Sequence, residues 1–348
     1  MRKPCASLTA MLTLRSILAL ALAPLCFAQS WSPQTSGVTV AMRGVSAVGD
    51  GVVWASGSGG TWLLSTDGGS TWKTGVVPGA EALDFRGIRG FDDKSAILMS
   101  AGPGDKSKIY STSDAGETWK LLFTNPDAKG FFDAINFPDR NLGFLLGDPV
   151  DGHLTVFRTG NGGADWIRVE MPEAVAGEGA FAASNSNIVV GGWNVWIATG
   201  GAGAGRVYHS SDGGKAWAPV ETPIRKDGPS AGIFSIAFAD PAHGVAVGGE
   251  YTKATERTGN IAVTDDGGTT WTAPKGQPPA GYRSSVAYLP DAKLWIATGP
   301  SGSDVSADGS DWKNFDAGSY NALSVAPDGA VWAVGQKGRI AKLVLKMP

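Results

Sequence analysis

Apolar and polar residues alternate along short stretches of this chain, and glycine-rich turns separate the stretches. One such unit reads Gly232-Ile-Phe-Ser-Ile-Ala-Phe238, then Gly244-Val-Ala-Val-Gly248, then Asn260-Ile-Ala-Val-Thr264. Alternation with a period of two is the pattern of half-buried β-strands. No segment after residue 30 shows sustained helical periodicity. The pattern therefore predicts an all-β fold.

A second pattern repeats on a longer scale and predicts the architecture. Six times, at intervals of 41 to 54 residues, a glycine-containing turn that begins Ser/Thr-x-Asp, with Asn in place of Asp in the third copy, leads into a tryptophan. A repeat of about 40–50 residues is the size of a four-stranded propeller blade. The six pairs of turn residue and tryptophan are Asp67 and Trp72, Asp114 and Trp119, Asn161 and Trp166, Asp212 and Trp217, Asp266 (or its neighbour Asp265) and Trp271, and Asp308 and Trp312.

These Asp-box residues are expected to be structural. Asp and Asn side chains accept hydrogen bonds from backbone N–H groups within turns. The tryptophan that follows each turn offers a large apolar area to pack between adjacent sheets.

A seventh unit lacks the Asp-box turn. Residues 320–335 repeat the first two strands of a blade, and residues 338–344 give the third. The mature N-terminus, Gln29-Ser-Trp31, can supply the fourth strand, with Trp31 in the place of a box tryptophan. Joining both termini in one blade removes the exposed edges of an open array. We therefore predict a seven-bladed β-propeller closed by the N-terminal strand; six blades with the last unit as an appendage is the alternative.

The first 28 residues have the features of a secretory signal peptide cleaved after Ala28. A positively charged start precedes an apolar run that extends to Phe27. Lipid attachment through Cys26 is a weaker alternative, because Leu25 stands where a lipoprotein signal has a small residue. Residues 29–348 are therefore expected to form a single exported domain, periplasmic or extracellular.

Composition narrows the chemistry of the exported domain. Both cysteines, Cys5 and Cys26, lie in the signal segment, so no thiolate site is expected in the mature chain. The remaining 26 basic and 32 acidic residues contain no basic run, which argues against a nucleic-acid partner. The three histidines fall in different repeats, so no metal and no cofactor is expected. We expect a monomer that associates with a membrane only through a partner.

The repeated unit resembles the bacterial neuraminidase repeat, which is shared by sialidases, sortilin-type receptors, xyloglucanases and the photosystem II stability/assembly factors. It is most similar to the last group, on the strength of blades such as Phe234-Ser-Ile-Ala-Phe-Ala-Asp-Pro-Ala-His-Gly-Val-Ala-Val-Gly248 followed by an Asp box. The resemblance covers residues 31–345. It implies a non-enzymatic propeller that assists membrane-protein assembly by binding.

Members of that group from phototrophs carry an arginine cluster on one face. In this chain Arg43 and Arg86 occupy equivalent positions at the start of inner strands, and Arg283 lies within one residue of the same place in the sixth repeat. Other repeats place Asp133, Phe234 and Asn321 there, so the cluster is partial and a photosystem role is not implied by it.

Binding is expected on the propeller face opposite the box turns. The longer loops, at 103–108, 148–153, 199–206 and 250–257, emerge on that face, and loops raised from a rigid ring are common binding sites. The candidate binding residues are Arg43, Arg86, Asp133, Asp148, Asp151, His153, Arg206, Tyr251, Arg257 and Arg283. The sequence thus favours an exported binding or assembly scaffold for a protein or an envelope component.

The alternative is a glycan-active protein, sialidase-like, another glycoside hydrolase or a lectin, that uses the same face. The Arg-Ile-Pro motif typical of sialidases is absent. A hydrolase would need two carboxylates roughly 5–10 Å apart near the axis. No catalytic residue is assigned from the sequence.

Overall fold

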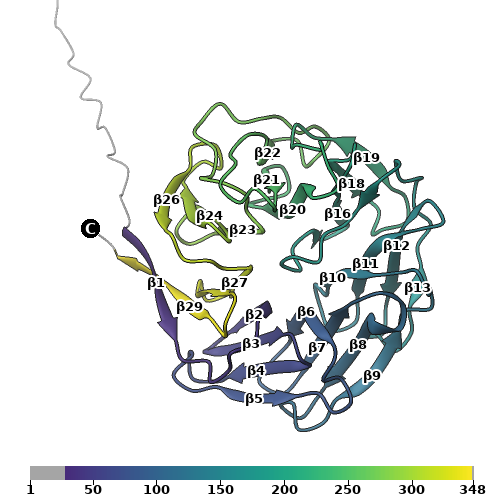
Figure 1. Cartoon of the computed structure of the whole chain (residues 1–348), viewed down its shortest axis with the longest axis vertical. Coiled ribbons are helices and arrows are strands. Elements are labelled where there is room, and N and C mark those ends of the chain that lie inside the picture. The colour runs from purple at the N-terminus through teal and green to yellow at the C-terminus, as the bar shows by residue number, and fades with distance from the viewer. Residues whose placement is uncertain (1–27, 347–348) are drawn as a thin grey trace, which may run out of the picture.

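Residues 28–346 are described by the computed structural model, and the predicted signal peptide lies outside them except for Ala28. The described residues form seven antiparallel sheets around one axis (Figure 1). Within residues 28–346 the only helix is a single 3-10 turn, η1 at Gly104–Lys106. The predicted all-β, seven-bladed fold is confirmed.

The strands follow one another from the axis outward in most blades. Blade 1 consists of β2 (Met42–Gly49), β3 (Val52–Gly57), β4 (Thr61–Ser65) and β5 (Lys73–Val76). Blade 2 consists of β6 (Asp84–Gly90), β7 (Ala96–Ala101), β8 (Lys108–Thr112) and β9 (Lys120–Thr124). Blade 3 consists of β10 (Phe132–Asn136), β11 (Gly143–Val150), β12 (His153–Thr159) and β13 (Ile167–Arg168). Blade 4 consists of β15 (Ile188–Gly191), β16 (Asn194–Ala198), β18 (Arg206–Ser210) and β19 (Ala218–Glu221).

Blades 5 to 7 show two departures from this order. Blade 5 consists of β20 (Ala231–Phe238), β21 (Gly244–Glu250) and β22 (Ile261–Thr264), extended on its inner side by β17 (Gly200–Gly201) and β14 (Glu178–Gly179). Blade 6 consists of β23 (Ser285–Leu289), β24 (Leu294–Gly299), β25 (Gly302–Ser306) and β26 (Lys313–Asp316). Blade 7 consists of β27 (Ala322–Val325), β28 (Val331–Val334), β29 (Ile340–Lys346) and β1 (Ala28–Gln34), so it contains strands from both ends of the described chain.

The outermost strand of blade 7 is β1, which pairs antiparallel with β29 along all seven of its residues. Trp31 in this strand is only 8% exposed. Its indole Nε1 donates to Ser303 Oγ of blade 6 at 3.0 Å, and its ring lies 5.2 Å from that of Tyr320. One tryptophan thus joins the last two blades.

The hydrophobic core lies between neighbouring blades. Between blades 1 and 2, for example, the rings of Trp54, Trp62 and Trp119 lie about 6 Å apart, at 5.8 to 6.2 Å. The surrounding cluster contains buried residues of both sheets, including Leu64 and Leu98. Because each blade buries its faces only against its two neighbours, the core is divided into seven layers around the ring.

The Asp-box turns share one hydrogen-bonding pattern. In blade 1, Thr71 donates to Asp67 from its backbone N at 2.9 Å and from its hydroxyl at 2.6 Å. Bonds from the threonine hydroxyl and amide hold the pKa of this carboxyl at about 2, as they do for Asp114 and Asp266. The glycine of the turn is also required: Gly69 has a φ of +89°, and a Cβ there would lie 2.4 Å from Trp332.

Side chains of the inner strands connect one blade to the next around the axis. Six of the seven junctions between blades contain such a bond, and in most of them a backbone N–H of one blade donates to a hydroxyl or amide oxygen of the neighbouring blade. The bonds join Ser324 to Ala47 N (2.9 Å), Ser46 to Gly90 N (3.0 Å), Asn185 to Ile135 N (2.7 Å), Ser186 to Ser235 (2.7 Å), Ser235 to Val286 N (2.9 Å) and Ser285 to Leu323 N (3.2 Å).

Candidate functional site

A β-bulge recurs at the start of the inner strand in four blades. In each case one residue has no partner on the second strand of the blade, because the register shifts there. These extra residues are Arg43 in β2, Arg86 in β6, Asp133 in β10 and Phe234 in β20. A bulge re-aims the side chain of the extra residue, and these four side chains line one cavity at the axis.

Glycine follows the bulged arginine in blades 1 and 2 for a steric reason. A Cβ at Gly44 would lie 2.6 Å from Ser56 Oγ, and one at Gly87 would lie 2.7 Å from Asn185 Oδ1. The Arg-Gly pairs seen in the sequence therefore have two separate causes: the arginine faces the axis, and the glycine lets the backbone approach its neighbours.

The cavity, called the axial pocket here, has a volume of about 550 Å³. On one side Arg43 and Arg86 converge on a single backbone oxygen, the carbonyl of Ala182, to which each donates at 3.1 Å. Arg86 also donates to Asp84 at 2.7 Å. Burial and the neighbouring Arg86 lower the pKa of Arg43, and its Nε is buried without a hydrogen-bond partner among the described residues.

Two carboxyl groups, those of Asp133 and Asp148, line the same pocket as the arginines. Asp133 is 1% exposed, and burial together with the nearby charge of Asp148 raises its pKa well above the usual range. Burial also raises the pKa of Asp148, whose Oδ1 accepts from Ala180 N at 3.0 Å. Arg43, Arg86 and Asp148 therefore hold the backbone of residues 180–182, which lie in the connection between β14 and β15, and Asp133 lines the same pocket.

The axial pocket also has an aromatic part. Phe181, from the same segment, stacks on Phe234 with a centroid separation of 3.9 Å and an interplanar angle of 8°. Tyr282 lies against Phe234 edge-on at 4.7 Å, and Tyr251, half exposed, lies edge-on at 6.1 Å. The axial pocket therefore combines a charged wall with an aromatic wall. In Figure 1 the teal segment ahead of β16 projects toward the centre of the ring.

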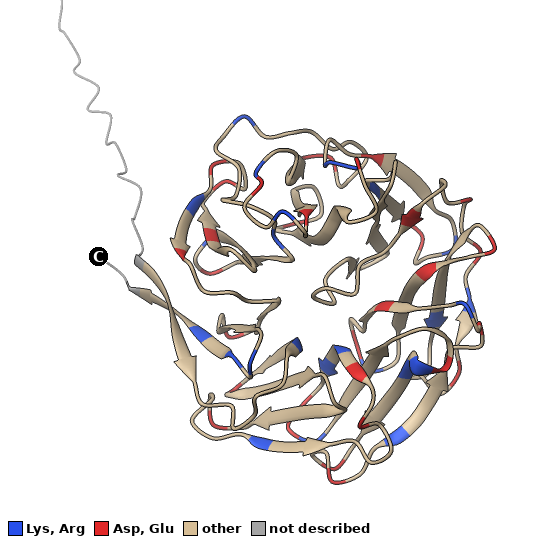
Figure 2. Ribbon diagram, in the orientation of Figure 1, with Lys and Arg blue, Asp and Glu red and all other residues tan. Residues whose placement is uncertain are grey.

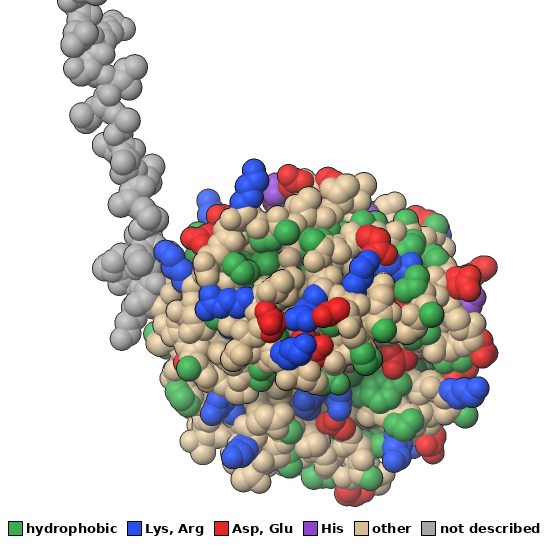
Figure 3. All heavy atoms as spheres, turned by 45° about the horizontal axis from the view of Figure 1, so that its top comes forward, with side chains coloured by type: hydrophobic (Ala, Val, Ile, Leu, Met, Phe, Trp, Pro, Cys, Tyr) green, Lys and Arg blue, Asp and Glu red, His purple; other side chains and the backbone are tan. Residues whose placement is uncertain are grey.

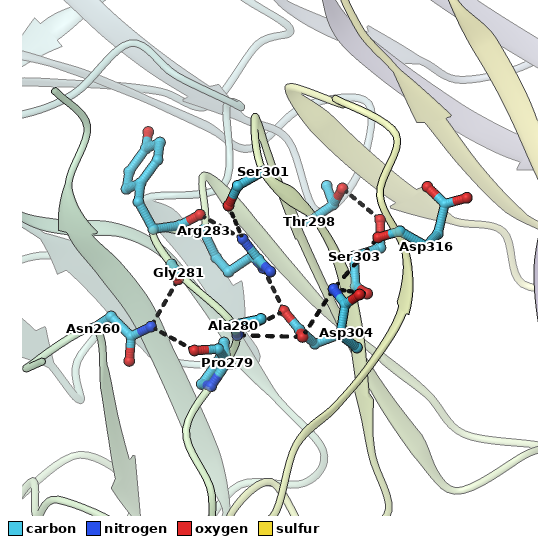
Figure 4. Close-up of polar contacts among 12 residues, drawn as sticks. Asn260, Pro279, Ala280, Gly281, Arg283, Thr298, Ser301, Ser303, Asp304 and Asp316 are labelled. Atoms are coloured by element: carbon cyan, nitrogen blue, oxygen red, sulfur yellow. Dashed lines mark hydrogen bonds and ion pairs between the residues drawn. The ribbon is translucent and has the colours of Figure 1, made fainter. Parts of the chain in front are cut away.

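Five of the ten predicted binding residues line the axial pocket: Arg43, Arg86, Asp133, Asp148 and Tyr251. Two others are buried in ion pairs elsewhere. Arg283 is fully buried and its Nε donates to Asp304 at 2.5 Å, with Nη1 bonded to Tyr282 O and Ser301 Oγ (Figure 4). Arg206 is bonded to Glu178 and to Tyr208, between blades 4 and 5. Both arginines are placed to support loops, without facing the axis.

The remaining three predicted residues lie outside the axial pocket on exposed loops or strand ends. Asp151 occupies the hairpin between β11 and β12 with a φ of +53°. His153 is exposed at the start of β12, and its Nδ1 contacts Met171 O at 2.9 Å. Arg257 is exposed in the loop before β22. The structure therefore does not bring them together with the arginine pair.

Sequence reasoning missed Phe181 and Tyr282 as pocket residues. Phe181 sits between alanines in a stretch with no strand-like alternation, so it has no counterpart in the other repeats. Tyr282 directly precedes Arg283, and its position became clear only from the fold. One signal was available: Phe234 stands at the repeat position of Arg43 and Arg86.

Charged residues of both signs are spread over the surface of the described residues. Basic and acidic residues are interspersed around the ring (Figure 2), and on the face seen in Figure 3 they are mixed with apolar side chains. Within residues 28–346, no group of three or more His, Cys, Asp or Glu side chains could hold a metal ion. The same residues include no helix long and apolar enough to cross a membrane.

Comparison with known proteins confirms the resemblance inferred from the repeats. The chain is 25% identical over 209 residues to the photosystem II assembly lipoprotein Ycf48 of Nostoc sp., and 24% identical over 209 residues to that of Trichormus variabilis. Each match covers 59% of this chain and 54% of the relative, so it spans about half the length of the curated proteins. No protein-family model matches the chain.

Solved structures share the fold over most of the chain. A structure of YCF48 bound to a D1 peptide superposes with a TM-score of 0.64 at 16% identity, covering 95% of this chain and 100% of that one. YCF48 from Cyanidioschyzon merolae gives 0.61 at 15% identity, covering 90% and 98%. A streptogramin B lyase gives 0.62 at 14% identity, covering 92% and 98%. Since a lyase shares the architecture, the fold alone does not decide between binding and catalysis.

Proposed function

We propose that the protein is an exported, non-enzymatic propeller that binds a protein or another envelope component at the axial pocket. The observation that carries the proposal is the pair Arg43 and Arg86, which meet on one peptide carbonyl in a pocket that also has aromatic side chains. The signal-like residues 1–28 support export. The similarity to assembly factors, one of which has been solved with a D1 peptide, supports a protein partner.

The chemistry of the axial pocket suits an extended peptide. The segment that already crosses it contributes a backbone carbonyl to the arginines and a phenyl ring to the aromatic wall. Each guanidinium has five N–H donors, so both arginines retain donors for carbonyl or carboxylate oxygens of a ligand. Tyr251, at 50% exposure, offers an accessible aromatic surface beside them. We therefore expect a partner that presents an extended segment with an apolar or aromatic side chain.

The proposal is tested by affinity capture from the native envelope fraction with the tagged protein. We expect wild type to enrich a discrete protein and Arg43→Glu/Arg86→Glu to lose it. Arg140→Glu/Arg158→Glu is the matched control, because it makes the same change in charge at two exposed arginines outside the axial pocket. Retention of the same partner by the Arg43/Arg86 variant would contradict the proposal.

A glycan-active protein is the second candidate, favoured by one observation: Asp133 and Asp148 are neighbouring acids in the axial pocket, and the charge of Asp148 helps to raise the pKa of Asp133. Against it, Asp133 is almost fully buried and Asp148 bonds the backbone of Ala180. Release of reducing sugar from envelope polysaccharide by wild type, lost in Asp148→Asn, would establish hydrolysis. Retention on polysaccharide without hydrolysis would indicate a lectin.

A further inference from the structure

A second cavity lies on the axis beyond the axial pocket and is walled by the inner strands. Its volume is about 260 Å³, and it is called the channel cavity here. Residues of β2, β6, β10 and β27 and the segment 184–186 line it. Since a water molecule takes roughly 30 Å³ in the liquid, the cavity has room for several waters or for one small ion with part of its hydration.

The channel cavity contains a cation without a counter-charge. Arg89 of β6 lines it, and also lines the wider depression of about 680 Å³ on the face that carries the box turns. Within the part of the chain that the structure describes, its Nε is buried without a hydrogen-bond partner. Burial lowers the pKa of Arg89, and no neighbouring carboxylate offsets that effect. Its guanidinium lies 5.8 Å from the ring of Phe91, a contact that uses none of its N–H donors.

Three neutral side chains of the channel cavity have free donor groups, although Asn136, which also lines it, uses its NH₂ on Ile188 O. The oxygens of Ser46 and Ser324 accept bonds from Gly90 N and Ala47 N, which leaves each hydroxyl proton to point elsewhere. Asn185 accepts from Ile135 N through Oδ1, so its NH₂ group remains a donor. All three side chains line the same cavity as Arg89, whose described lining contains no Asp or Glu.

We infer that the channel cavity binds a small oxyanion, held by Arg89 with Ser46, Ser324 and Asn185 as neutral donors. Arg89 is half-buried and makes no ion pair among the described residues, and three neutral side chains with free donor groups line the same cavity. The shared ligand chemistry is a tetrahedral oxyanion or a carboxylate. This site is separate from the axial pocket and does not rest on the proposed function.

Equilibrium dialysis of the purified protein against radiolabelled sulfate, at constant ionic strength in chloride, tests the site. We expect saturable uptake of one sulfate per chain, with at least a tenfold loss of affinity in Arg89→Met. Arg140→Met is the matched control, because Arg140 lines the depression on the box face but not the channel cavity, and is already paired with Asp92 at 2.6 Å. It should bind sulfate as wild type does.

Two further arms complete the test. Competition with inorganic phosphate and with acetate separates the two ligand classes: displacement by acetate assigns carboxylates, and displacement by phosphate alone assigns tetrahedral oxyanions. Asn185→Asp covers the case in which Arg89→Met fails to fold, because it keeps the acceptor for Ile135 N and places a carboxylate in the cavity, which should abolish uptake. Absence of saturable uptake by wild type, unchanged uptake by a folded Arg89→Met or by Asn185→Asp, or equal loss in Arg140→Met would each overturn the inference.

Discussion

Replacing Arg283 by methionine is expected to destabilise the fold by about 3–5 kcal/mol, the usual cost of removing one partner of a buried ion pair. Arg283 is 0% and Asp304 1% exposed, and their atoms lie 2.5 Å apart. After the substitution Asp304 keeps only long contacts, at 3.3 Å to Ala280 N and 3.4 Å to Asn314 Nδ2 (Figure 4). A carboxylate in that position would remain buried and poorly compensated.

Urea denaturation followed by tryptophan fluorescence measures the effect, since the chain has 13 tryptophans. The double variant Arg283→Met/Asp304→Asn should recover most of the lost free energy of unfolding, because it removes the uncompensated charge. Arg140→Met, which breaks an exposed pair, should cost less than about 1 kcal/mol. If Arg283→Met costs no more than Arg140→Met, the reasoning about burial is wrong. Loss of partner capture by a stable Arg283→Met would show that this arginine acts in binding.

Three other substitutions test the remaining structural arguments. Burial raises the pKa of Asp133. A carboxyl group whose pKa is higher in the folded than in the unfolded protein destabilises the fold as pH rises above its unfolded pKa, near 4. Asp133→Asn should therefore melt at a higher temperature than wild type at pH 7, and the difference should shrink toward pH 4. A difference that is constant with pH would contradict this assignment. Asp114→Ala should lower the melting temperature more than Asp114→Asn. Alanine loses both bonds from Thr118, whereas an asparagine can accept the backbone bond, as Asn161 does at the equivalent position in blade 3. Equal melting temperatures of the two variants would show that the hydrogen bonds to the Asp-box side chain do not stabilise the turn. Trp31→Ala should cost about 3–5 kcal/mol by urea denaturation, the range for a buried aromatic side chain, and a cost under 1 kcal/mol would show that its contact with blade 6 is unimportant.

The fold could be predicted from the sequence because it depends on local signals that recur. Each repeat carries a period-two pattern, a turn whose aspartate bonds its own backbone, and a tryptophan at a fixed distance. The strand predicted at 244–248 is observed as part of β21, Gly244–Glu250. The equivalence of Arg43 and Arg86 also followed from the repeat, because the same bulge places both at the axis.

The rest of the site depends on contacts that no repeat encodes. Arg283 stands one residue from the bulge position and lies before β23 begins at Ser285, and its side chain is buried against Asp304 of the same blade. Arg206 pairs with Glu178, 28 residues earlier, through a strand insertion that is specific to blades 4 and 5. Phe181 stacks on Phe234 because its neighbours Ala180 and Ala182 are held by Asp148 and by two arginines, which come from three other blades. Such long-range pairings become visible only once the ring is closed.

At the bulges at Arg43, Arg86, Asp133 and Phe234, the identity of the side chain does not affect the pairing of the strands. Because the extra residue takes no part in strand pairing, a cation, an acid and a phenyl ring occupy the same backbone position in different blades of one molecule. Exchanging side chains among these positions is therefore expected to change what the ring recognises while the sheets keep their register. The propeller thus has a set of positions around its axis at which side chains can be exchanged. Substitution at one bulge position at a time is therefore expected to change ligand specificity without changing the fold.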